Sequence, residues 1–243
     1  MNFPAIEIKN LSFSYNKEFF FKNINIKICE KSFIGIIGPN GSGKTTFCKL
    51  ILGLLKPISG EILYFNNFLQ NFSEIGYVSQ NTNVKDFPLT VKELILLGSV
   101  DKKSSFNYFS KNIKRRADNL IQELGLEKIQ NFPLTKLSGG QIQLTLIAKA
   151  LIKNPKILIL DEPTSHLDQT AQKIILKILS KIKKDTTILL VGHDLNTIIK
   201  HVDKMLLIDK TIKMLSLDEI CEHFALGLYH HPLINSKHPH KHD

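Results

Sequence analysis

The hydrophobic pattern near the start of the chain has a period of two. Apolar and polar residues alternate through three segments, which are residues 5–10, 11–15 and 19–28. Such alternation is typical of strands with one buried and one exposed face. It predicts strands before residue 30.

A second pattern consists of short aliphatic runs without alternation, at residues 32–37, 156–161, 186–192 and 204–209. These runs predict central strands that are buried on both faces. Helical patterns follow them, at residues 47–55, 169–182 and 195–201. Strands that alternate with helices predict an α/β fold with a mostly parallel sheet and helices on both faces.

The stretch from about residue 82 to residue 155 differs from both patterns. Residues 91–97 and 113–124 have strong helical periodicity, and the stretch contains no obvious buried strand. We interpret this stretch as a helical subdomain inserted into the α/β core. From residue 221 the composition changes to histidine, proline and polar residues, so we predict one domain over 1–220 and a tail over 221–243.

Composition and charge narrow the class of protein. The chain has 43% hydrophobic and 22% charged residues, which excludes a disordered, collagen-like or coiled-coil chain. Its formal net charge of +10 would suit nucleic acid or an anionic membrane. However, Arg115 and Arg116 are its only arginines, and the lysines are scattered. We therefore interpret the charge as a solvated lysine-rich surface and expect no nucleic-acid partner.

Segments for membrane insertion or secretion are not evident. No apolar run approaches the roughly 18 residues that span a bilayer, and the first ten residues lack the pattern of a secretory signal. The three cysteines, Cys29, Cys48 and Cys221, lack metal-ligand spacing. Reduced thiols in a cytoplasmic protein are the simplest interpretation.

A phosphate-binding loop follows the first buried strand. The sequence from Gly38 to Thr45 fits the eight-residue phosphate-loop pattern, and it opens a predicted helix, as that motif requires. Glycines let backbone N–H groups point at phosphate oxygens, and the helix dipole adds to their effect. Lys44 would reach the β- and γ-phosphates, and the Thr45 hydroxyl would bind Mg²⁺. A glycine-rich turn without a ligand is the alternative.

A nucleotide site also needs a carboxylate for the metal. Asp161 ends a predicted buried strand, as that role requires. Its neighbour Glu162 could orient or activate the attacking water. An ordinary acidic residue at a helix start is the alternative for Glu162.

Together these motifs resemble the ABC-type ATPases. The segment Leu137-Ser-Gly-Gly-Gln141 matches the signature of that family, and further motifs occur in the family's order. They are Tyr15, the phosphate loop, Gln80, the signature, Asp161-Glu162-Pro163, the segment from Ser165 to Asp168, and His193. The resemblance covers about residues 5–215 and implies an ATPase core of the P-loop (RecA-like) type, with an N-terminal antiparallel β subdomain and a helical subdomain that carries the signature.

The resemblance implies a role for each motif. Tyr15 would stack on adenine, Asp161 and Gln80 would complete the shell of Mg²⁺ and water, Glu162 would polarise the attacking water, and His193 would contact the γ-phosphate. The residues expected to hold the triphosphate are Gly38, Pro39, Asn40, Gly41, Ser42, Gly43, Lys44, Thr45 and Thr46.

Family members act as head-to-tail dimers. The signature residues of one chain would therefore cap ATP bound to the other chain; they are Ser138, Gly139, Gly140 and Gln141. Asp168 would lie at the dimer seam.

Two positions depart from the family pattern, because Leu144 and Lys149 stand where arginine is usual. His166 stands where a small residue is more usual.

A transporter subunit fits the chain architecture. The gap between phosphate loop and signature has no room for the coiled coil of repair relatives, and the chain has one ATPase unit rather than the two of translation-factor relatives. The resemblance implies two integral-membrane permease subunits that dock near Gln80 and residues 81–98, an extracytoplasmic metal-binding protein as an indirect partner, and a peripheral location on the cytoplasmic face of the membrane.

Two segments resemble metal importers. Residues 86–98 are similar to zinc and manganese importer ATPases, although Thr90 and Glu93 could simply form a capping box. The tail resembles zinc importers, and its histidines could bind Zn²⁺ loosely; they are His230, His231, His238, His240 and His242. An inert tail is the alternative. We expect zinc as cargo, with manganese, iron or another substrate as alternatives and a nucleic-acid ATPase as a remote one.

Overall fold

The computed structural model describes residues 3–16, 20–67, 74–80, 84, 86–100, 109–165, 167–192, 198–209, 211–216 and 219. Its strands and helices, with η for short 3-10 helices, are β1 (Pro4–Phe13), β2 (Phe21–Cys29), β3 (Phe33–Ile37), α1 (Lys44–Ile51), β4 (Ser59–Tyr64), β5 (Ile75–Val78), α2 (Val91–Leu97), α3 (Lys111–Glu123), η2 (Glu127–Ile129), η3 (Leu134–Lys136), α4 (Gly139–Leu151), β6 (Ile157–Asp161), α5 (Gln169–Ile182), β7 (Thr187–Val191), β8 (Lys204–Asp209) and β9 (Thr211–Ser216).

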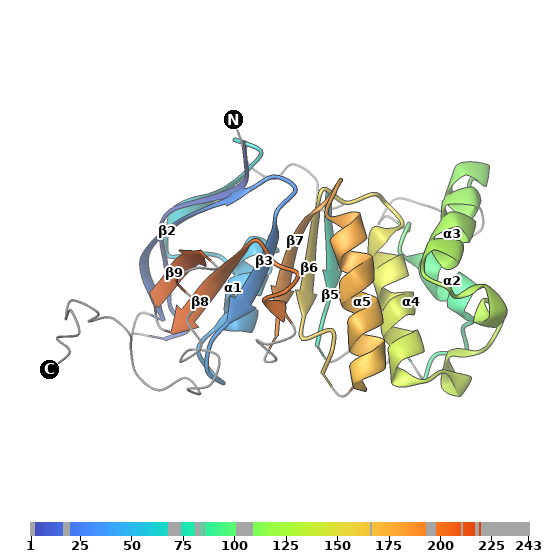
Figure 1. Ribbon diagram of the computed structural model, residues 1–243. Helices are drawn as coiled ribbons and strands as arrows, with labels where there is room; N and C mark the ends of the chain where they lie inside the picture. The colour runs from blue at the N-terminus through green and yellow to red at the C-terminus, as the bar shows by residue number, and fades with distance from the viewer. Residues whose placement is uncertain are drawn as a thin grey trace, which may run out of the picture.

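Two sheets form the core of the molecule. A three-stranded antiparallel sheet has the order β2-β1-β4, and a six-stranded sheet has the order β5-β6-β7-β3-β8-β9. All pairs in the second sheet are parallel except β8 with β9. The predicted α/β fold, with its mostly parallel sheet and its N-terminal antiparallel sheet, is therefore confirmed (Figure 1).

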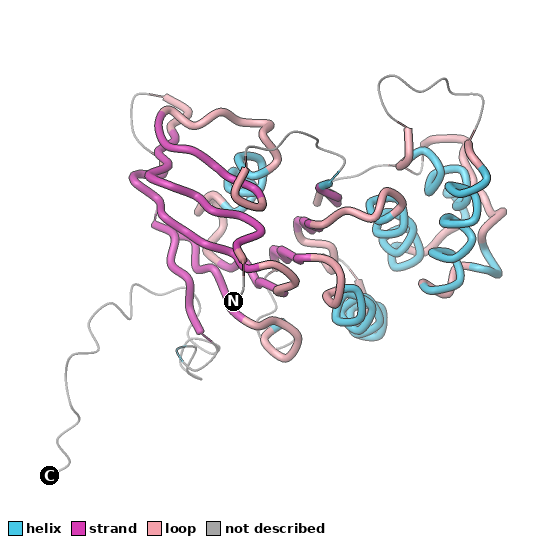
Figure 2. Tube along the Cα trace, turned by 90° about the horizontal axis from the view of Figure 1, so that it is seen from above, coloured by secondary structure: helices cyan, strands magenta, loops and turns pink. Residues whose placement is uncertain are grey.

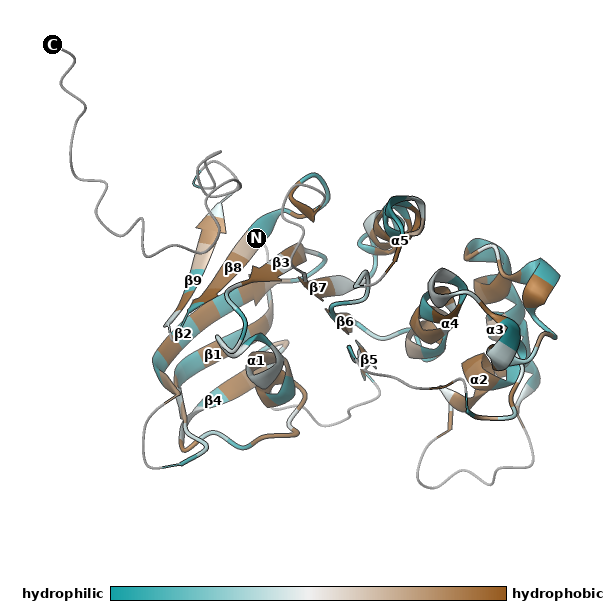
Figure 3. Cartoon of the chain, turned by 90° about the horizontal axis from the view of Figure 1, so that it is seen from below, coloured by the Kyte–Doolittle hydropathy of each residue, from teal (hydrophilic) through white to brown (hydrophobic). Residues whose placement is uncertain are grey.

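Each face of the six-stranded sheet contributes to a separate hydrophobic core. In β6, Leu158 and Leu160 pack with residues of α2 to α5, whereas Ile157 and Ile159 pack with residues of α1 and the antiparallel sheet. Successive side chains of a strand point to opposite faces, so one continuous apolar run can serve both cores. The apolar colouring of these central strands is visible in Figure 3.

Helices α2, α3 and α4 lie between β5 and β6 in the chain and gather beyond the β5 edge of the sheet (Figures 1 and 2). Thr90 and Glu93 form the predicted capping box at the start of α2. The limits of this region at 82 and 155 and the domain boundary at 220 stay predictions. Residues 195–197 of the helix predicted at 195–201 and all of the tail at 221–243 lie outside the described residues.

The first helix differs from its prediction at both ends. We predicted residues 47–55, but α1 spans Lys44–Ile51. It begins earlier because the phosphate loop leads directly into it. It ends earlier because Gly53 has a φ of 66°, and the N–H groups of Gly53 and Leu54 donate to the carbonyls of Leu50 and Lys49. This is a Schellman ending, which glycine favours.

The strand prediction missed three features. The segments predicted as separate strands at 5–10 and 11–15 form the single strand β1, in which Asn10 has a φ of 48° and the register shifts between Ile8 and Leu11. A bulge therefore bends β1 at the polar residues that suggested a break. Strands β4 and β9 were not predicted, because they are partly exposed and lack a regular pattern.

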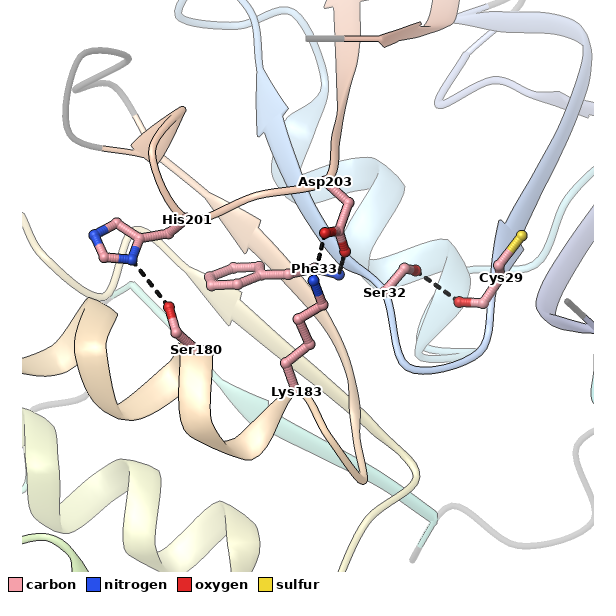
Figure 4. A network of polar contacts seen from close by, with 7 residues as sticks. All are labelled: Cys29, Ser32, Phe33, Ser180, Lys183, His201 and Asp203. Carbon is pink, nitrogen blue, oxygen red and sulfur yellow. Dashed lines mark hydrogen bonds and ion pairs between the residues drawn. The ribbon is translucent and has the colours of Figure 1, made fainter.

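One carboxylate ties three elements together at the start of β3 (Figure 4). Asp203, just before β8, accepts a hydrogen bond from the Phe33 backbone N–H at 2.8 Å and pairs with Lys183 at the end of α5. Ser180 of α5 lies 2.9 Å from Nδ1 of His201. These contacts fix the end of α5 against the strand that leads to the phosphate loop.

Candidate functional site

Several of the predicted site residues lie at one edge of the six-stranded sheet. Strands β3, β5 and β6 are parallel members of one sheet, so their carboxyl ends point to the same edge. The phosphate loop follows β3, Gln80 follows β5, and Asp161 ends β6. Ligands of open α/β sheets bind at this edge.

A cavity of about 420 Å³ opens there. It is lined by residues of the phosphate loop and of the two neighbouring strand ends, together with one aromatic residue: Phe20, Asn40, Gly41, Gly43, Lys44, Thr45, Thr46, Gln80 and Glu162. Its volume falls within the range of small-ligand pockets. The structure therefore brings the phosphate loop, Gln80 and Glu162 together around one space.

The phosphate loop has the backbone geometry of an anion nest. Gly41 and Gly43 have φ values of 78° and 105°, which side chains rarely allow. Gly43 precedes α1, and no side chain caps that helix start. The Lys44 ammonium donates to the carbonyls of Gly38 and Pro39 at 2.9 and 3.0 Å, and burial lowers its pKa.

Thr45 and Asp161 meet beside the loop. The Thr45 hydroxyl donates a 2.9 Å hydrogen bond to Oδ2 of Asp161. The other carboxylate oxygen, Oδ1, is buried and has no hydrogen-bond partner among the described residues. Burial raises the pKa of Asp161. A hydroxyl beside an unsatisfied carboxylate oxygen suits Mg²⁺, which prefers oxygen ligands.

Gln80 and Glu162 also line the cavity. Nε2 of Gln80 donates to Oε2 of Glu162 at 2.6 Å. Glu162 has a φ of 52°, which is uncommon for a residue with a side chain and is typical of strained functional positions. The turn is held by its neighbours, because the Glu162 N–H donates to the Val191 carbonyl and the Ser165 hydroxyl donates to the Glu162 carbonyl.

An aromatic group borders the cavity. Tyr15 is 56% exposed, and its hydroxyl lies 2.9 Å from Oγ1 of Thr46. Its ring meets Phe13 and Phe20 edge to face, at centroid distances of 4.8 and 5.8 Å. Sequence analysis missed Phe20, which lines the cavity and packs over Gly43. The run of aromatic residues at 19–21, next to the predicted Tyr15, was the only indication of it.

The signature residues do not line this cavity. Ser138 caps α4, where its hydroxyl accepts from the Gln141 N–H at 3.3 Å while Oε1 of Gln141 accepts from the Ser138 N–H at 3.0 Å. The Ser138 hydroxyl only accepts in this capping box, so its proton makes no hydrogen bond within it. A Cβ on Gly139 or Gly140 would lie within 3.3 Å of residues flanking the start of α5, so the glycines let the two helices approach.

The positions that depart from the family pattern have local explanations. Leu144 lies in α4 and packs against the hydrophobic core. The backbone and stem of Lys149 lie against Gly98, where any added Cβ would clash. Asp168 caps α5 by accepting from the Ala171 N–H at 2.9 Å. His193, His166 and the tail histidines lie outside the described residues.

Within the ranges that the structure describes, no helix is both long and apolar enough to cross a bilayer. The same ranges contain no group of three or more histidine, cysteine or acidic residues that could hold a metal ion.

Comparison with known proteins agrees with the fold and this site. The family model described as ABC transporter matches residues 21–165. The zinc uptake system ATP-binding protein ZurA of Listeria monocytogenes is 38% identical over 214 residues, which cover 85% of this chain and 83% of ZurA. The manganese transport system ATP-binding protein MntB of Halalkalibacterium halodurans is 33% identical over 212 residues, covering 86% and 84% of the two chains.

A solved structure has a similar fold over most of this chain. The dimeric bacterial ABC transporter cassette MJ0796 has a TM-score of 0.71 and 30% identity, and the match covers 87% of this chain and 98% of that one. Fold and site thus define an ATP-binding cassette with the nucleotide and Mg²⁺ site of such ATPases. The chain belongs to the ABC transporter family.

Proposed function

We propose that this chain is the ATP-hydrolysing subunit of a metal-ion importer whose cargo is zinc. The observation that carries the ATPase function is the single cavity shared by Lys44, Thr45, Gln80 and Glu162, with the unsatisfied carboxylate oxygen of Asp161 beside Thr45. The cargo rests on similarity to relatives named for zinc uptake and zinc import, of which ZurA is 38% identical.

Each residue has a role that its position supports. The backbone N–H groups of the loop from Gly38 to Thr46 would hold the triphosphate of ATP, and Lys44 would turn from the loop carbonyls to the β- and γ-phosphates. Thr45 and Asp161 would hold Mg²⁺, with Gln80 on its water shell; the ion neutralises phosphate charge when bound.

Glu162 would accept the proton of the attacking water, and Gln80 orients its carboxylate at 2.6 Å. His193 would contact the γ-phosphate, and Tyr15 would stack on adenine.

Hydrolysis would require two copies of the chain. Ser138, Gly139, Gly140 and Gln141 lie away from their own cavity, so a second, head-to-tail copy would bring them to ATP. The Ser138 hydroxyl already accepts a hydrogen bond from Gln141, so its proton is free to donate to a phosphate oxygen. Asp168 would lie at the seam between the copies. The dimeric cassette MJ0796 supports this arrangement.

The partners would be two membrane permease subunits. They would dock near Gln80 and residues 81–98, of which Phe87 is 55% exposed. The chain would then lie on the cytoplasmic face of the membrane as a peripheral subunit, and an extracytoplasmic metal-binding protein would deliver the cargo to the permease. Zn²⁺ binding by the tail histidines remains a separate proposal.

Manganese is the second candidate cargo, because MntB is 33% identical. Metal uptake in cells lacking this chain separates the two. Wild type should restore ⁶⁵Zn uptake, whereas Glu162→Gln should not, since loss of a general base lowers rates about 100-fold or more. Glu127→Gln, a change to an exposed carboxylate on η2, is the matched control and should restore uptake fully.

The outcomes distinguish the parts of the proposal. Restoration of ⁵⁴Mn uptake in place of zinc would replace the cargo and leave the ATPase. Restoration by Glu162→Gln would remove Glu162 from catalysis. If wild type restored uptake of no metal, the importer function would be wrong.

A further inference from the structure

A second cavity lies at the opposite ends of the helices, away from the nucleotide site. It has a volume of about 560 Å³ and is formed by α3, the ends of α4 and α5, and the loops before β6 and β7. Its apolar wall consists of Leu120, Leu124, Leu151, Ile178 and Ile182, together with Pro155. None of the motifs in the nucleotide site contributes to it. Both its size and its mainly aliphatic wall are typical of small-ligand pockets.

Arg116 supplies the polar end of this cavity. Its Nε is buried and has no hydrogen-bond partner among the described residues. Its Nη1 lies 3.9 Å from Oε1 of Glu123, too far for a hydrogen bond, and the Glu123 side chain is 60% exposed. A buried guanidinium donor without an acceptor is unfavourable, so this edge is suited to a carboxylate from a ligand.

The other polar groups argue for one negative charge. Lys181 adds a second cation on the α5 side, whereas Glu123 and Asp185 are exposed carboxylates that would repel a dianion. The backbone carbonyls at the ends of α4 and α5 already accept hydrogen bonds, so they do not offer a cation site. The Ile182 carbonyl accepts from Asp185 and Thr186, and the Leu151 carbonyl accepts from Asn154.

We propose that this cavity binds a small amphipathic monoanion, namely a carboxylate with an aliphatic body. The carboxylate contacts Arg116, and the aliphatic part lies against Leu120, Leu151 and Ile178. This site shares no lining residue with the nucleotide cavity and does not depend on the proposed cargo.

The position of the cavity gives such a ligand an effect on ATP hydrolysis. Helix α4 begins at the signature residue Ser138 and ends at the cavity, and α5 begins after Asp168 and ends there too. Both are rigid helices about 20 Å long. A ligand between their far ends sets the angle between them, and with it the spacing of Ser138 and Asp168 at their starts.

Calorimetric titration of the full-length, nucleotide-free chain with octanoate tests the site. Octanol and octylamine, which have the same chain with no charge or a positive charge, are the ligand controls. We expect saturable octanoate binding that weakens about tenfold in Arg116→Gln and is partly kept in Arg116→Lys. Arg115→Gln is the matched control, because Arg115 is the exposed neighbour outside the cavity and should bind like wild type.

A second variant, Ile178→Trp, fills the cavity without changing a charge and should abolish binding. Equal octanoate binding by wild type, Arg116→Gln and Ile178→Trp would overturn the site, as would the absence of saturable binding up to the solubility limit. Tighter binding of octylamine would overturn the anionic ligand. Octanoate should also change the rate of ATP hydrolysis in wild type and not in Arg116→Gln; binding without that change would overturn the link between the helix ends.

Discussion

The starts of α1 and α4 satisfy their unpaired backbone N–H groups in opposite ways. At α1 the residue before the helix is Gly43, and no side chain accepts a hydrogen bond from the first turn. At α4 Ser138 and Gln141 cap each other in a reciprocal box. The first helix start is therefore completed only by a ligand, whereas the second is complete without one.

This difference fits the tasks proposed for the two helices. A helix start with free N–H groups is an anion site by construction. A capped start is rigid in the absence of ligand and can present a hydroxyl proton to a site on another chain. Substitution of the two capping residues should therefore separate binding of the nucleotide from its hydrolysis.

Gly43→Ala should have the largest effect. The substitution strains a φ of 105° and places a Cβ 2.3 Å from Cε1 of Phe20, so we expect a loss of about 2–4 kcal/mol in the free energy of unfolding. Nucleotide affinity should fall by at least about tenfold, because the nest is distorted. Chemical denaturation and titration with a fluorescent ATP analogue measure the two quantities.

Gly125→Ala is the matched control for that substitution. Gly125 has a φ of 68°, but a Cβ there would meet nothing within 4 Å. Gly125→Ala should lower the free energy of unfolding by about 1 kcal/mol and leave the nucleotide affinity unchanged. If both variants kept full affinity, the anion nest at Gly43 would not be the nucleotide site.

Ser138→Ala should have an intermediate effect. Loss of the cap should cost about 1 kcal/mol of stability, and the rate of ATP hydrolysis should fall about tenfold or more while nucleotide affinity is kept. Ser110→Ala, which removes the cap of α3 by the same chemistry, should cost a similar free energy and leave the rate unchanged. Equal rates for the two variants would contradict a role for Ser138 across the dimer.

Asp161→Asn should have the smallest effect on stability, with the opposite sign. Burial raises the pKa of Asp161 in the folded chain above its ordinary 3.8, so the ionised carboxylate destabilises the nucleotide-free fold. The variant should be slightly more stable than wild type at neutral pH. This difference in stability should shrink as the pH falls through the raised pKa of Asp161, and it should vanish below pH 3.8. Urea denaturation across this range measures it, and a gap that widened at low pH would contradict the assignment.

Local motifs made much of the site predictable. The loop from Gly38 to Thr45 and the pair Asp161 and Glu162 carry their chemistry in short, ordered segments, and the sheet edge that joins them follows from parallel strands. The hydrogen bond between Gln80 and Glu162 agrees with the placement that the resemblance implied for both residues near the cavity.

The missed features depend on contacts between distant residues or on single backbone angles. Phe20 lines the cavity because its ring lies over Gly43, which no spacing rule predicts. The end of α1 depends on the φ of Gly53, although the apolar residues continue beyond it. The 560 Å³ cavity is assembled from three helices and two loops, so no continuous segment of sequence indicates it.

The placement of β3 in the sheet has a consequence for how the chain is made. This strand carries the phosphate loop, yet among the described residues it pairs only with β7 and β8, and its first hydrogen bond to Asp203 joins positions 170 residues apart. A ribosome releases the N-terminal part of a chain first. The phosphate loop therefore emerges long before the strands that hold it, and the capacity to bind nucleotide marks a chain whose synthesis has passed β8.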